Sequence, residues 1–394
     1  MYICKKRNAH IHWWGETIVI IGPNGYYKLS NLETFMVQKV MQNNDMTSVV
    51  YTISDELNVN IDETEKFVLK FINNYKEVFE VNKFKQDNIG ISGEKGKFYP
   101  IELHVSLTSM CNQKCIHCYK NAGVKNENID YNKLVAFFKY MEGKVPFLTL
   151  SGGDALMYPY IEDILELFGE KYQICVMTSG YSITPSQICS LKRASRGVYI
   201  SVYSSQPKVH NAFVKTQNSY ERIFDNIRKL RSEDISVGIS TLLKEENSND
   251  ITNLIESLIP MGVERISLGT ISNLGRARDN NLQIPNSDRM YEQMRLIQEQ
   301  YKDIVVLQED GNGIKRRILS PFKCMAGSLL WCVYENGEIY PCGTCKNEKL
   351  LMGDIDDYMP CVDNIISYYD KISKLPLIKK MDSDKCNCPF EEEL

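Results

Sequence analysis

The 394-residue sequence contains no run that approaches the roughly eighteen consecutive apolar residues of a membrane-spanning helix. Its basic start, residues 1–7, is followed only by a brief apolar stretch at 17–21, so no secretory signal is expected. An excess of one charge is also lacking, because 46 Lys and Arg residues stand against 50 Asp and Glu. These absences predict a cytoplasmic protein with neither a membrane nor a nucleic acid as partner.

Cysteine is abundant by contrast, with 13 residues that mostly gather in short spacings. In the reducing cytoplasm such cysteines are expected to serve as metal ligands rather than as disulfides. Cys4, Cys175 and Cys189 stand outside every such spacing, and we interpret them as buried, inert thiols. The chain is long enough for two or three domains.

Three cysteines, Cys111, Cys115 and Cys118, follow the apolar run 101–107. Three thiolates on one loop can hold three corners of a four-iron cluster, and they leave the fourth iron without a protein ligand. A structural zinc site is the alternative, but it normally closes a tetrahedron from paired cysteines and histidines. His117 lies inside the loop with poor geometry for that fourth position, so the cluster is favoured.

A second motif, Gly152-Gly153-Asp154, ends the apolar strand pattern that begins at Pro146. Glycines at a strand end let a ligand approach the backbone, and a carboxylate beside them can accept hydrogen bonds from an ammonium group. Alone, this motif would indicate only a turn. Its position at the end of the strand after the three cysteines favours a ligand site.

Strand and helix patterns alternate from residue 99 to about 301, which predicts an α/β fold with a parallel sheet. Ligand sites in such folds lie at the carboxyl ends of the strands. Ser179 and Ser201 lie at the ends of the third and fourth predicted strands. The strands are expected at 101–107, 147–151, 173–178, 197–203, 236–242 and 264–269, and the helices begin near residues 130, 159, 184, 219, 249 and 287.

The first 85 residues have their own pattern of two strands (11–21 and 26–29), three helices (32–41, 49–57 and 61–75) and a closing strand (78–81). This pattern predicts a small winged-helix-like domain. It carries ten basic and ten acidic residues, which argues against DNA binding and favours the capture of a peptide on an open strand edge. A packing domain without a ligand is the alternative. Residues 86–98 are rich in Gly and charge and are interpreted as a linker.

The C-x3-C-x2-C spacing resembles the cluster motif of the radical S-adenosylmethionine (SAM) enzymes. This resemblance implies a partial (β/α)6 barrel over residues 99–305, a [4Fe-4S] cluster on the three cysteines, and SAM bound to its open iron. Gly152-Gly153-Asp154 resembles the family's Gly-Gly-Glu motif, which implies that it binds the amino group of SAM, with Asp154 in place of the usual Glu. Ser179, at the next strand end, could hydrogen-bond SAM, with a helix N-terminal turn as the alternative. Ser201 stands at a strand end where family members carry a polar residue that meets the ribose or carboxylate of SAM. The usual arginine is missing from the stretch 210–220, so Lys215 or Arg276 is expected to meet the SAM carboxylate.

After residue 306 cysteines crowd again, and Cys324, Gly337 and Cys342 resemble the start of the auxiliary-cluster domains called SPASM and twitch. The chain departs from the full pattern and ends on Cys386-Asn-Cys388. The resemblance implies a small iron-sulfur domain over 306–394, with one auxiliary [4Fe-4S] cluster on Cys324, Cys342, Cys386 and Cys388. A zinc knuckle with the same ligands is the alternative. Cys332 and Cys361 are interpreted as structural, and Cys345 is left unassigned.

This order of domains resembles the radical SAM maturases of ribosomal peptides, and the terminal Cys-x-Cys resembles sactisynthases of the sporulation killing factor type. The resemblance implies a precursor peptide whose leader binds residues 1–85, an electron donor such as flavodoxin or ferredoxin, and a thioether bond from a cysteine sulfur to an α-carbon. Carbon-carbon or β/γ-thioether bonds and epimerisation stay open, as does an iron-sulfur redox sensor that binds DNA.

Overall fold

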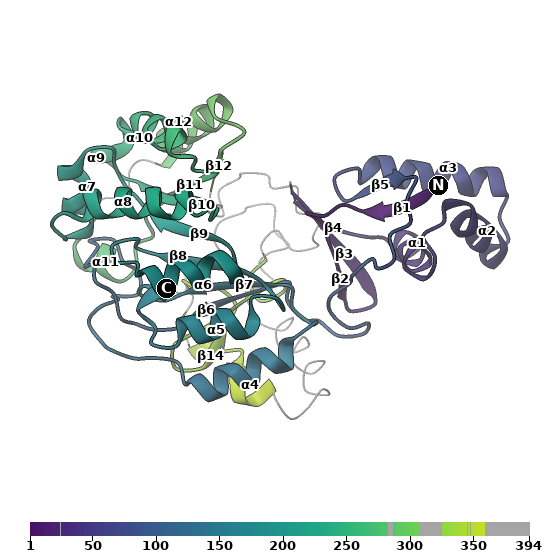
Figure 1. Ribbon diagram of the computed structural model, residues 1–394, viewed down its shortest axis with the longest axis horizontal. Coiled ribbons are helices and arrows are strands. Elements are labelled where there is room, and N and C mark those ends of the chain that lie inside the picture. The colour runs from purple at the N-terminus through teal and green to yellow at the C-terminus, as the bar shows by residue number, and fades with distance from the viewer. Residues whose placement is uncertain (24, 283–286, 308–324, 345, 347, 359–394) are drawn as a thin grey trace.

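The structure is a computed structural model that describes residues 1–23, 25–282, 287–307, 325–344, 346 and 348–358. Within these ranges the chain forms a small N-terminal domain and a larger α/β domain (Figure 1). No helix in the described part of the chain is long and apolar enough to cross a membrane.

The larger domain is built on one ten-stranded sheet whose strand order is β12-β11-β10-β9-β8-β7-β6-β13-β14-β15. The eight strands from β12 to β13 run parallel, whereas β14 and β15 are antiparallel additions. The bounds are β6 Glu102–Ser106, β7 Phe147–Ser151, β8 Gln173–Thr178, β9 Ser195–Ser201, β10 Val237–Leu243, β11 Arg265–Thr270, β12 Val305–Leu307, β13 Leu330–Val333, β14 Glu338–Tyr340 and β15 Gly353–Asp354. All six predicted strands are confirmed, and β12 and β13 are additional parallel strands.

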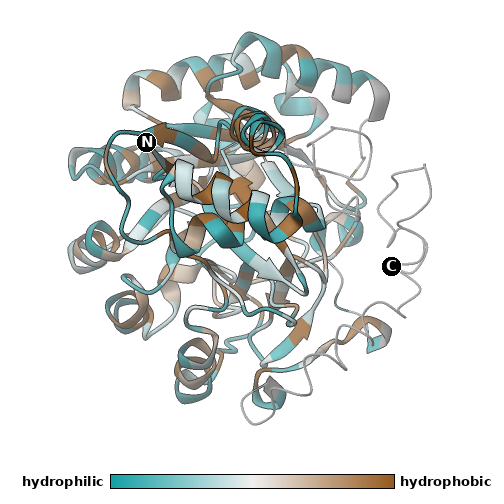
Figure 2. Cartoon of the chain, turned by 90° about the vertical axis from the view of Figure 1, so that its right-hand side faces the viewer, coloured by the Kyte–Doolittle hydropathy of each residue, from teal (hydrophilic) through white to brown (hydrophobic). Residues whose placement is uncertain are grey.

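Helices follow the strands and cover one face of the sheet (Figure 1). Their bounds are α4 Tyr131–Met141, α5 Ile161–Phe168, α6 Pro185–Ala194, α7 Pro207–Val214, α8 Ser219–Ser232, α9 Glu245–Ser248, α10 Ile251–Leu258, α11 Arg276–Asp279 and α12 Ser287–Gln300. Alternate strand residues such as Leu103 and Val105 join the apolar helix faces in one buried core. Figure 2 shows these helices around the outside of the sheet, with hydrophobic and hydrophilic residues mixed along them.

The opposite face of the sheet is polar, because the residues that alternate with the core residues along β6 are Glu102, His104 and Ser106. The hydroxyl of Thr149 on β7 donates to Glu102 at 2.7 Å, and Ser151 lies 2.7 Å from His104 Nε2. A parallel sheet with helices outside and polar side chains inside is the predicted partial barrel. Burial lowers the pKa of His104 to about 4, so this histidine is neutral inside the barrel.

The N-terminal domain contains two small sheets, β1 with β5 and β2-β3-β4, packed against three helices. Its elements are β1 Tyr2–Lys5, β2 His10–Trp14, β3 Thr17–Gly22, β4 Gly25–Lys28, α1 Asn31–Gln42, α2 Met46–Leu57, α3 Ile61–Asn74 and β5 Phe79–Asn82. The predicted strand 11–21 is two strands, because Gly15 adopts a left-handed φ of +61° and turns the chain between them. Strand β1 was not predicted, and α2 begins three residues earlier than expected, capped by Asp45.

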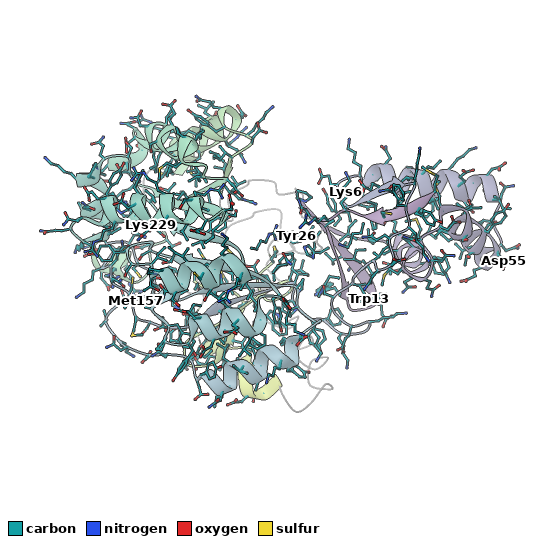
Figure 3. All side chains as sticks on the ribbon, viewed as in Figure 1. Lys6, Trp13, Tyr26, Asp55, Met157 and Lys229 are labelled. Carbon is teal, nitrogen blue, oxygen red and sulfur yellow. The ribbon has the colours of Figure 1, made fainter. Side chains whose placement is uncertain are left out.

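The two domains share a small apolar cluster at the amino ends of the barrel strands. Trp14, Val19 and Ile21 from β2 and β3 pack there with Ile101 and Leu329. Tyr26 packs against the same cluster, on the side of the N-terminal domain that faces the barrel (Figure 3). The segment 86–98 follows the surface of β2, where Trp13 N donates to Ser92 O at 2.8 Å and Gly15 N donates to Lys97 O at 2.7 Å.

Candidate functional site

The loop that follows β6 carries Cys111, Cys115 and Cys118, and all three thiols are half-buried. Burial, and then the nearby Asp154 carboxylate, raises the pKa of the Cys111 thiol to about 12. Burial, and then the neighbouring Cys111 and Cys118, raises the pKa of Cys115. Thiols that oppose one another's ionisation in this way need a cationic centre to become thiolates, which is what an iron cluster provides.

The backbone of this loop already directs donors at the sulfurs. Gln113 N donates to Cys111 Sγ and Ala122 N donates to Cys118 Sγ, both at 3.4 Å. Hydrogen bonds of this kind stabilise cluster thiolates and tune their potential. Within the described ranges no three His, Cys, Asp or Glu side chains converge as they would around one metal ion. A four-iron cluster binds each thiolate on a separate iron, so the three cysteines fit it without such convergence.

His117 is held away from the role of a metal ligand by Tyr203. Its Nε2 lies 3.0 Å from the Tyr203 hydroxyl, and its ring packs edge-on against the Tyr203 ring at 4.8 Å between centroids. Burial, and then Arg276, lowers the pKa of His117 to about 3, so the ring is neutral. Its buried Nδ1 has no partner in the described protein.

Loop 274–280, after β11, packs against the cysteine loop and donates hydrogen bonds to its backbone. Arg276 donates through Nε to Cys115 O and through one Nη to Ala122 O, each at 2.8 Å. Its backbone N–H donates to Cys118 O at 3.0 Å, and Asn280 Nδ2 donates to Ile116 O at 2.8 Å. Arg276 therefore holds the backbone of the cysteine loop. Lys215, the other residue predicted for the SAM carboxylate, is exposed at the end of α7.

The Gly-Gly-Asp turn packs directly on the cysteine loop. A Cβ at Gly152 would lie 2.4 Å from Thr108 O, and one at Gly153 would lie 2.3 Å from Met110 O. Gly153 N donates to Thr108 O at 2.7 Å, and Asp154 N donates to Met110 O at 2.9 Å. Glycine is therefore required at both positions because the backbone of the cysteine loop packs against them. The sequence had suggested a different reason, the approach of a ligand to the backbone.

Asp154 lies buried between the ends of β7 and β8, with 2% of its surface exposed. Its Oδ1 accepts from Leu156 N at 3.1 Å and from the Thr178 hydroxyl at 2.7 Å. Its Oδ2 accepts from Ser179 N at 3.1 Å and from the Ser179 hydroxyl at 2.5 Å. Four donors fill the lone pairs of a carboxylate, so an ammonium group at Asp154 must displace one of them. The structure brings the predicted Asp154 and Ser179 together, and sequence reasoning missed Thr178.

Ser201 ends β9 on the polar face of the sheet, because the alternating Val198 and Ile200 belong to the helix-side core. It is register-paired with Ser240 on β10. Two residues further, Tyr203 stacks on Phe213 at 4.3 Å between ring centroids and contacts His117. The predicted SAM residues therefore lie at the carboxyl ends of β7, β8 and β9, as in the prediction.

Of the predicted auxiliary-cluster ligands the structure describes Cys342, whereas Cys324, Cys386 and Cys388 lie outside the described residues, as do Cys345 and Cys361. Strands β13 and β14 form an antiparallel hairpin that joins the barrel sheet beside β6. Cys332 and Cys342 share a small apolar cluster on this hairpin. A Cβ at Gly343 would lie 3.4 Å from the Tyr119 hydroxyl and 3.9 Å from Cys332 Sγ. Tyr119, which follows Cys118, thus reaches from the first cysteine loop to the hairpin cysteines.

A buried ion pair also joins the cysteine loop to the hairpin. Lys120 Nζ lies 3.0 Å from Glu335 Oε2, and each side chain is 10% exposed. The Ser106 hydroxyl donates to the same carboxylate oxygen at 2.8 Å. Lys120 lies 4.7 Å from the centre of the Tyr334 ring. Despite burial, the Lys120 cation lowers the pKa of Glu335, so the carboxylate is charged.

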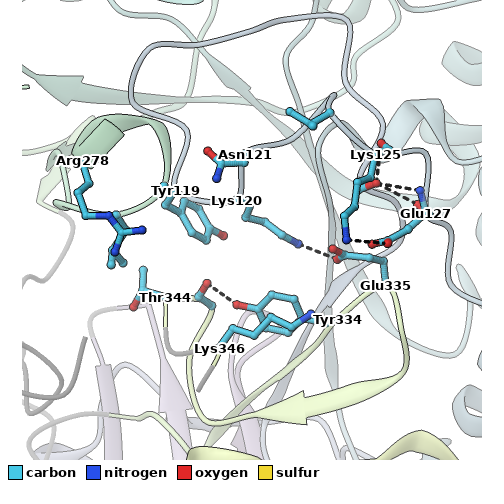
Figure 4. Close-up of a pocket in the computed structure, with 15 residues that line it drawn as sticks. Tyr119, Lys120, Asn121, Lys125, Glu127, Arg278, Tyr334, Glu335, Thr344 and Lys346 are labelled. Carbon is cyan, nitrogen blue, oxygen red and sulfur yellow. Dashed lines mark hydrogen bonds and ion pairs between the residues drawn. The ribbon is translucent and has the colours of Figure 1, made fainter. Parts of the chain in front are cut away.

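Between the cysteine loop, loop 274–280 and the hairpin lies a cavity of about 580 Å³ (Figure 4). This volume lies in the usual range for ligand sites, roughly 300–1,000 Å³. We call it the hairpin cavity. Residues that line it include Tyr119, Lys120, Arg278, Tyr334 and Thr344. It contacts both the segment after Cys118 and the segment after Cys342.

Comparison with known proteins agrees with this geometry. Residues 105–258 match the model of the radical SAM superfamily. The chain is 24% identical over 347 residues to the antilisterial bacteriocin subtilosin biosynthesis protein AlbA of Bacillus subtilis, which covers 80% of this chain and 71% of AlbA. It is 21% identical over 314 residues to the sporulation killing factor maturation protein SkfB of the same organism, which covers 77% of this chain and 75% of SkfB.

Among solved structures, Streptococcus suis SuiB bound to S-adenosylmethionine superposes with a TM-score of 0.67 at 14% identity, over 96% of this chain and 90% of SuiB. SuiB bound to precursor peptide SuiA superposes with a TM-score of 0.63. This likeness shows a shared fold that extends over both domains.

Proposed function

The chain belongs to the radical SAM superfamily, and from this premise we propose that it is an enzyme that matures a ribosomally synthesised precursor peptide. Membership of the superfamily implies a [4Fe-4S] cluster and SAM. The proposal of a peptide substrate is supported by the similarity to AlbA and SkfB over more than three quarters of the chain. It is also supported by a fold shared with SuiB, of which one structure holds a precursor peptide.

In this proposal Cys111, Cys115 and Cys118 would hold the cluster, and the cluster with SAM would supply the radical chemistry of the family. Gly152, Gly153, Asp154, Ser179 and Ser201 surround the amino-acid part of SAM. Asp154 fixes Ser179 relative to the cysteine loop through its four hydrogen bonds. The inner face of the partial barrel would shield the reacting atoms from water.

We further propose that the product is a thioether between a cysteine sulfur and an α-carbon of the precursor, and that residues 1–85 bind the leader of that precursor. One auxiliary [4Fe-4S] cluster would use Cys324, Cys342, Cys386 and Cys388, and a flavodoxin or ferredoxin would supply electrons. Tyr119 supports an auxiliary site, because its side chain connects the first cysteine loop with Cys332 and Cys342.

The observation that carries the proposal is the half-buried group of three thiols, with backbone donors aimed at its sulfurs and the Gly-Gly-Asp turn packed against it. We expect Cys111→Ala to abolish release of 5'-deoxyadenosine from SAM by anaerobically reconstituted, dithionite-reduced protein. The matched control is Cys189→Ala, because this thiol is exposed and not buried as the sequence predicted. Wild-type levels of 5'-deoxyadenosine from the Cys111 variant would refute the cluster assignment.

The bond that is formed is tested separately by mass spectrometry. The probe would be a cysteine-containing precursor peptide, such as one encoded by a short reading frame if one lies beside the gene. A thioether or carbon-carbon link lowers the mass by two hydrogens, whereas epimerisation leaves the mass unchanged. Fragmentation that places the link at a cysteine and an α-carbon would support the thioether, and an unchanged mass would exclude it.

A further inference from the structure

The charges that line the hairpin cavity are unequal. Four basic residues face two acidic ones, and the lining includes Lys120, Lys125, Arg278, Lys346, Glu127 and Glu335. Two of the basic residues pair with acidic residues of the lining, Lys120 with Glu335 at 3.0 Å and Lys125 with Glu127 at 3.2 Å. Arg278 and Lys346 lie 3.8 and 3.7 Å from carboxylates that do not line the cavity, so the lining itself carries a net positive charge.

Among the four basic residues of the lining, Arg278 lies farthest from its carboxylate partner. Its Nε lies 3.8 Å from the carboxylate of Asp279, beyond hydrogen-bond distance, and its side chain is 60% exposed. Lys346 is more constrained, since its Nζ lies 3.7 Å from Glu338 and 4.7 Å from the centre of the Tyr334 ring. In Figure 4 the Arg278 guanidinium points into the cavity, toward Tyr119 and Thr344.

The backbone beneath Arg278 is fixed against the cysteine loop. Gly275 has a φ of +51°, and a Cβ there would lie 2.4 Å from Tyr119 O. Arg276, one residue on, is hydrogen-bonded to the carbonyls of Cys115, Cys118 and Ala122. Because α11 is only four residues long, Arg278 is held at a set position relative to the three cysteines.

We propose that the hairpin cavity holds the core segment of the precursor peptide, and that Arg278, assisted by Lys346, binds the carboxylate of an Asp or Glu residue in that segment. This inference rests on the proposed function. A guanidinium can bind a carboxylate through two parallel hydrogen bonds, which fixes the orientation of the acidic residue as well as its position. The residue to be modified would then be presented at a set distance from the cysteine loop.

SAM also carries a carboxylate, but the cavity lining does not include Gly152, Gly153, Asp154, Ser179 or Ser201. The residues proposed for SAM thus lie outside the cavity. The volume of about 580 Å³ suits a short peptide segment, and the aromatic rings of Tyr119 and Tyr334 offer it apolar contacts.

The test uses two synthetic probes, the amides of acetyl-Gly-Gly-Glu-Gly-Cys-Gly and of the same peptide with Gln in place of Glu. Their dissociation constants for the full chain are measured by ligand-observed NMR at low salt. We expect the Glu peptide to bind about tenfold more tightly than the Gln peptide, as a charge-assisted pair predicts. The difference should shrink as salt screens the charges.

Arg278→Gln should reduce the tenfold preference for the Glu peptide to about twofold or less. Arg278→Lys should keep part of this preference, because lysine keeps the positive charge but cannot form two parallel hydrogen bonds to the carboxylate. Lys125→Gln is the matched control, since this lysine lines the same cavity but is neutralised by Glu127, and it should keep the preference.

Equal binding of the two peptides by the wild type would overturn the proposal, as would a preference that survives in the Arg278→Gln/Lys346→Gln double variant. Weaker binding of SAM alone to the Arg278→Gln protein would assign this arginine to the cofactor and would overturn it too. The peptide titration requires no SAM cleavage, so a failure of 5'-deoxyadenosine release would count against the proposed function and leave this measurement valid.

Discussion

Arg276 holds the cysteine loop through two side-chain hydrogen bonds. We expect Arg276→Ala to leave the carbonyls of Cys115 and Ala122 without these donors. Each hydrogen bond from a charged donor contributes about 1.5–3 kcal/mol, so the loop should lose most of its order. Iron bound per chain after anaerobic reconstitution should fall at least by half.

The control for this variant is Arg228→Ala, which removes an exposed arginine that pairs with Asp225 on the same helix. It should bind iron as the wild type does. An Arg276→Ala protein with full iron content and a wild-type cluster spectrum would mean that the cysteine loop does not depend on the hydrogen bonds from Arg276.

Some residues of the site could be predicted from the sequence, and others could not. The three cysteines could be predicted because their chemistry needs a fixed spacing within one loop. Arg276 could be named only as one of two candidates for the SAM carboxylate. Its hydrogen bonds to backbone carbonyls 161 and 154 residues away in the chain could not be predicted from the sequence. Thr178 carries no motif at all. Its role arises because β8 lies beside β7 and brings its hydroxyl to Asp154.

At the scale of elements, the Lys120-Glu335 pair determines how the β13-β14 hairpin sits on the cysteine loop. Glu335→Gln should lower the thermal unfolding midpoint, because it leaves the Lys120 charge buried without its carboxylate, at a cost of about 3–5 kcal/mol. Amide hydrogen exchange should speed up in β13 and β14 more than in β8 or β10. The measurement is hydrogen exchange followed by mass spectrometry.

A double variant, Lys120→Met with Glu335→Leu, separates charge from packing. Replacing both partners of a buried pair by apolar residues is often nearly neutral, so most of the lost stability should return. If the double variant is as unstable as Glu335→Gln, the ion pair is not what holds the hairpin.

The elements themselves were predictable where local pattern and tertiary setting agree. Strands β6 to β11 are continuous apolar or alternating runs between helices, and each was found within two residues of its bounds. The prediction of one strand over 11–21 was wrong because apolar residues lie on both sides of Gly15, so the sequence pattern does not mark the turn between β2 and β3. Strand β1 is four residues long, and its partner β5 lies more than 70 residues away in the chain. No local sequence pattern predicts this pairing.

For the whole molecule, the two domains meet at the amino ends of the barrel strands, while the cysteine loop and the hairpin cavity lie at their carboxyl ends. Ile101, in the shared cluster, precedes β6, and the cysteines follow it. The five residues of β6 span about 17 Å. A precursor whose leader binds the N-terminal domain must therefore cross at least this distance, so about five or more extended residues should separate its leader from the residue that is modified.

The junction between the domains also contains a buried histidine, His12, that should make the arrangement sensitive to acid. Its Nδ1 lies 2.9 Å from the Ser92 hydroxyl and its Nε2 lies 3.0 Å from Tyr99 O, so both ring nitrogens contact the segment that leads to the barrel. Burial lowers the pKa of His12 to about 4, against an ordinary value near 6.5. The neutral ring donates from Nε2 and accepts at Nδ1. Protonation would make Nδ1 a donor, so the Ser92 hydroxyl would have to turn its own hydrogen toward Ile11 O at 3.4 Å, and the charged ring would be buried.

Because the folded-state pKa lies below the unfolded value, the contribution of His12 to stability is fully present above about pH 6.5 and is lost as the pH falls toward 4. The loss should approach about 1.4 kcal/mol for each pH unit in that window. We expect the thermal midpoint of the N-terminal domain, and its resistance to trypsin at 86–98, to fall from pH 7 to pH 5. A His12→Gln variant, which cannot take up the proton, should show a shallower dependence on pH, and equal slopes for the two proteins would show that the junction does not depend on this histidine.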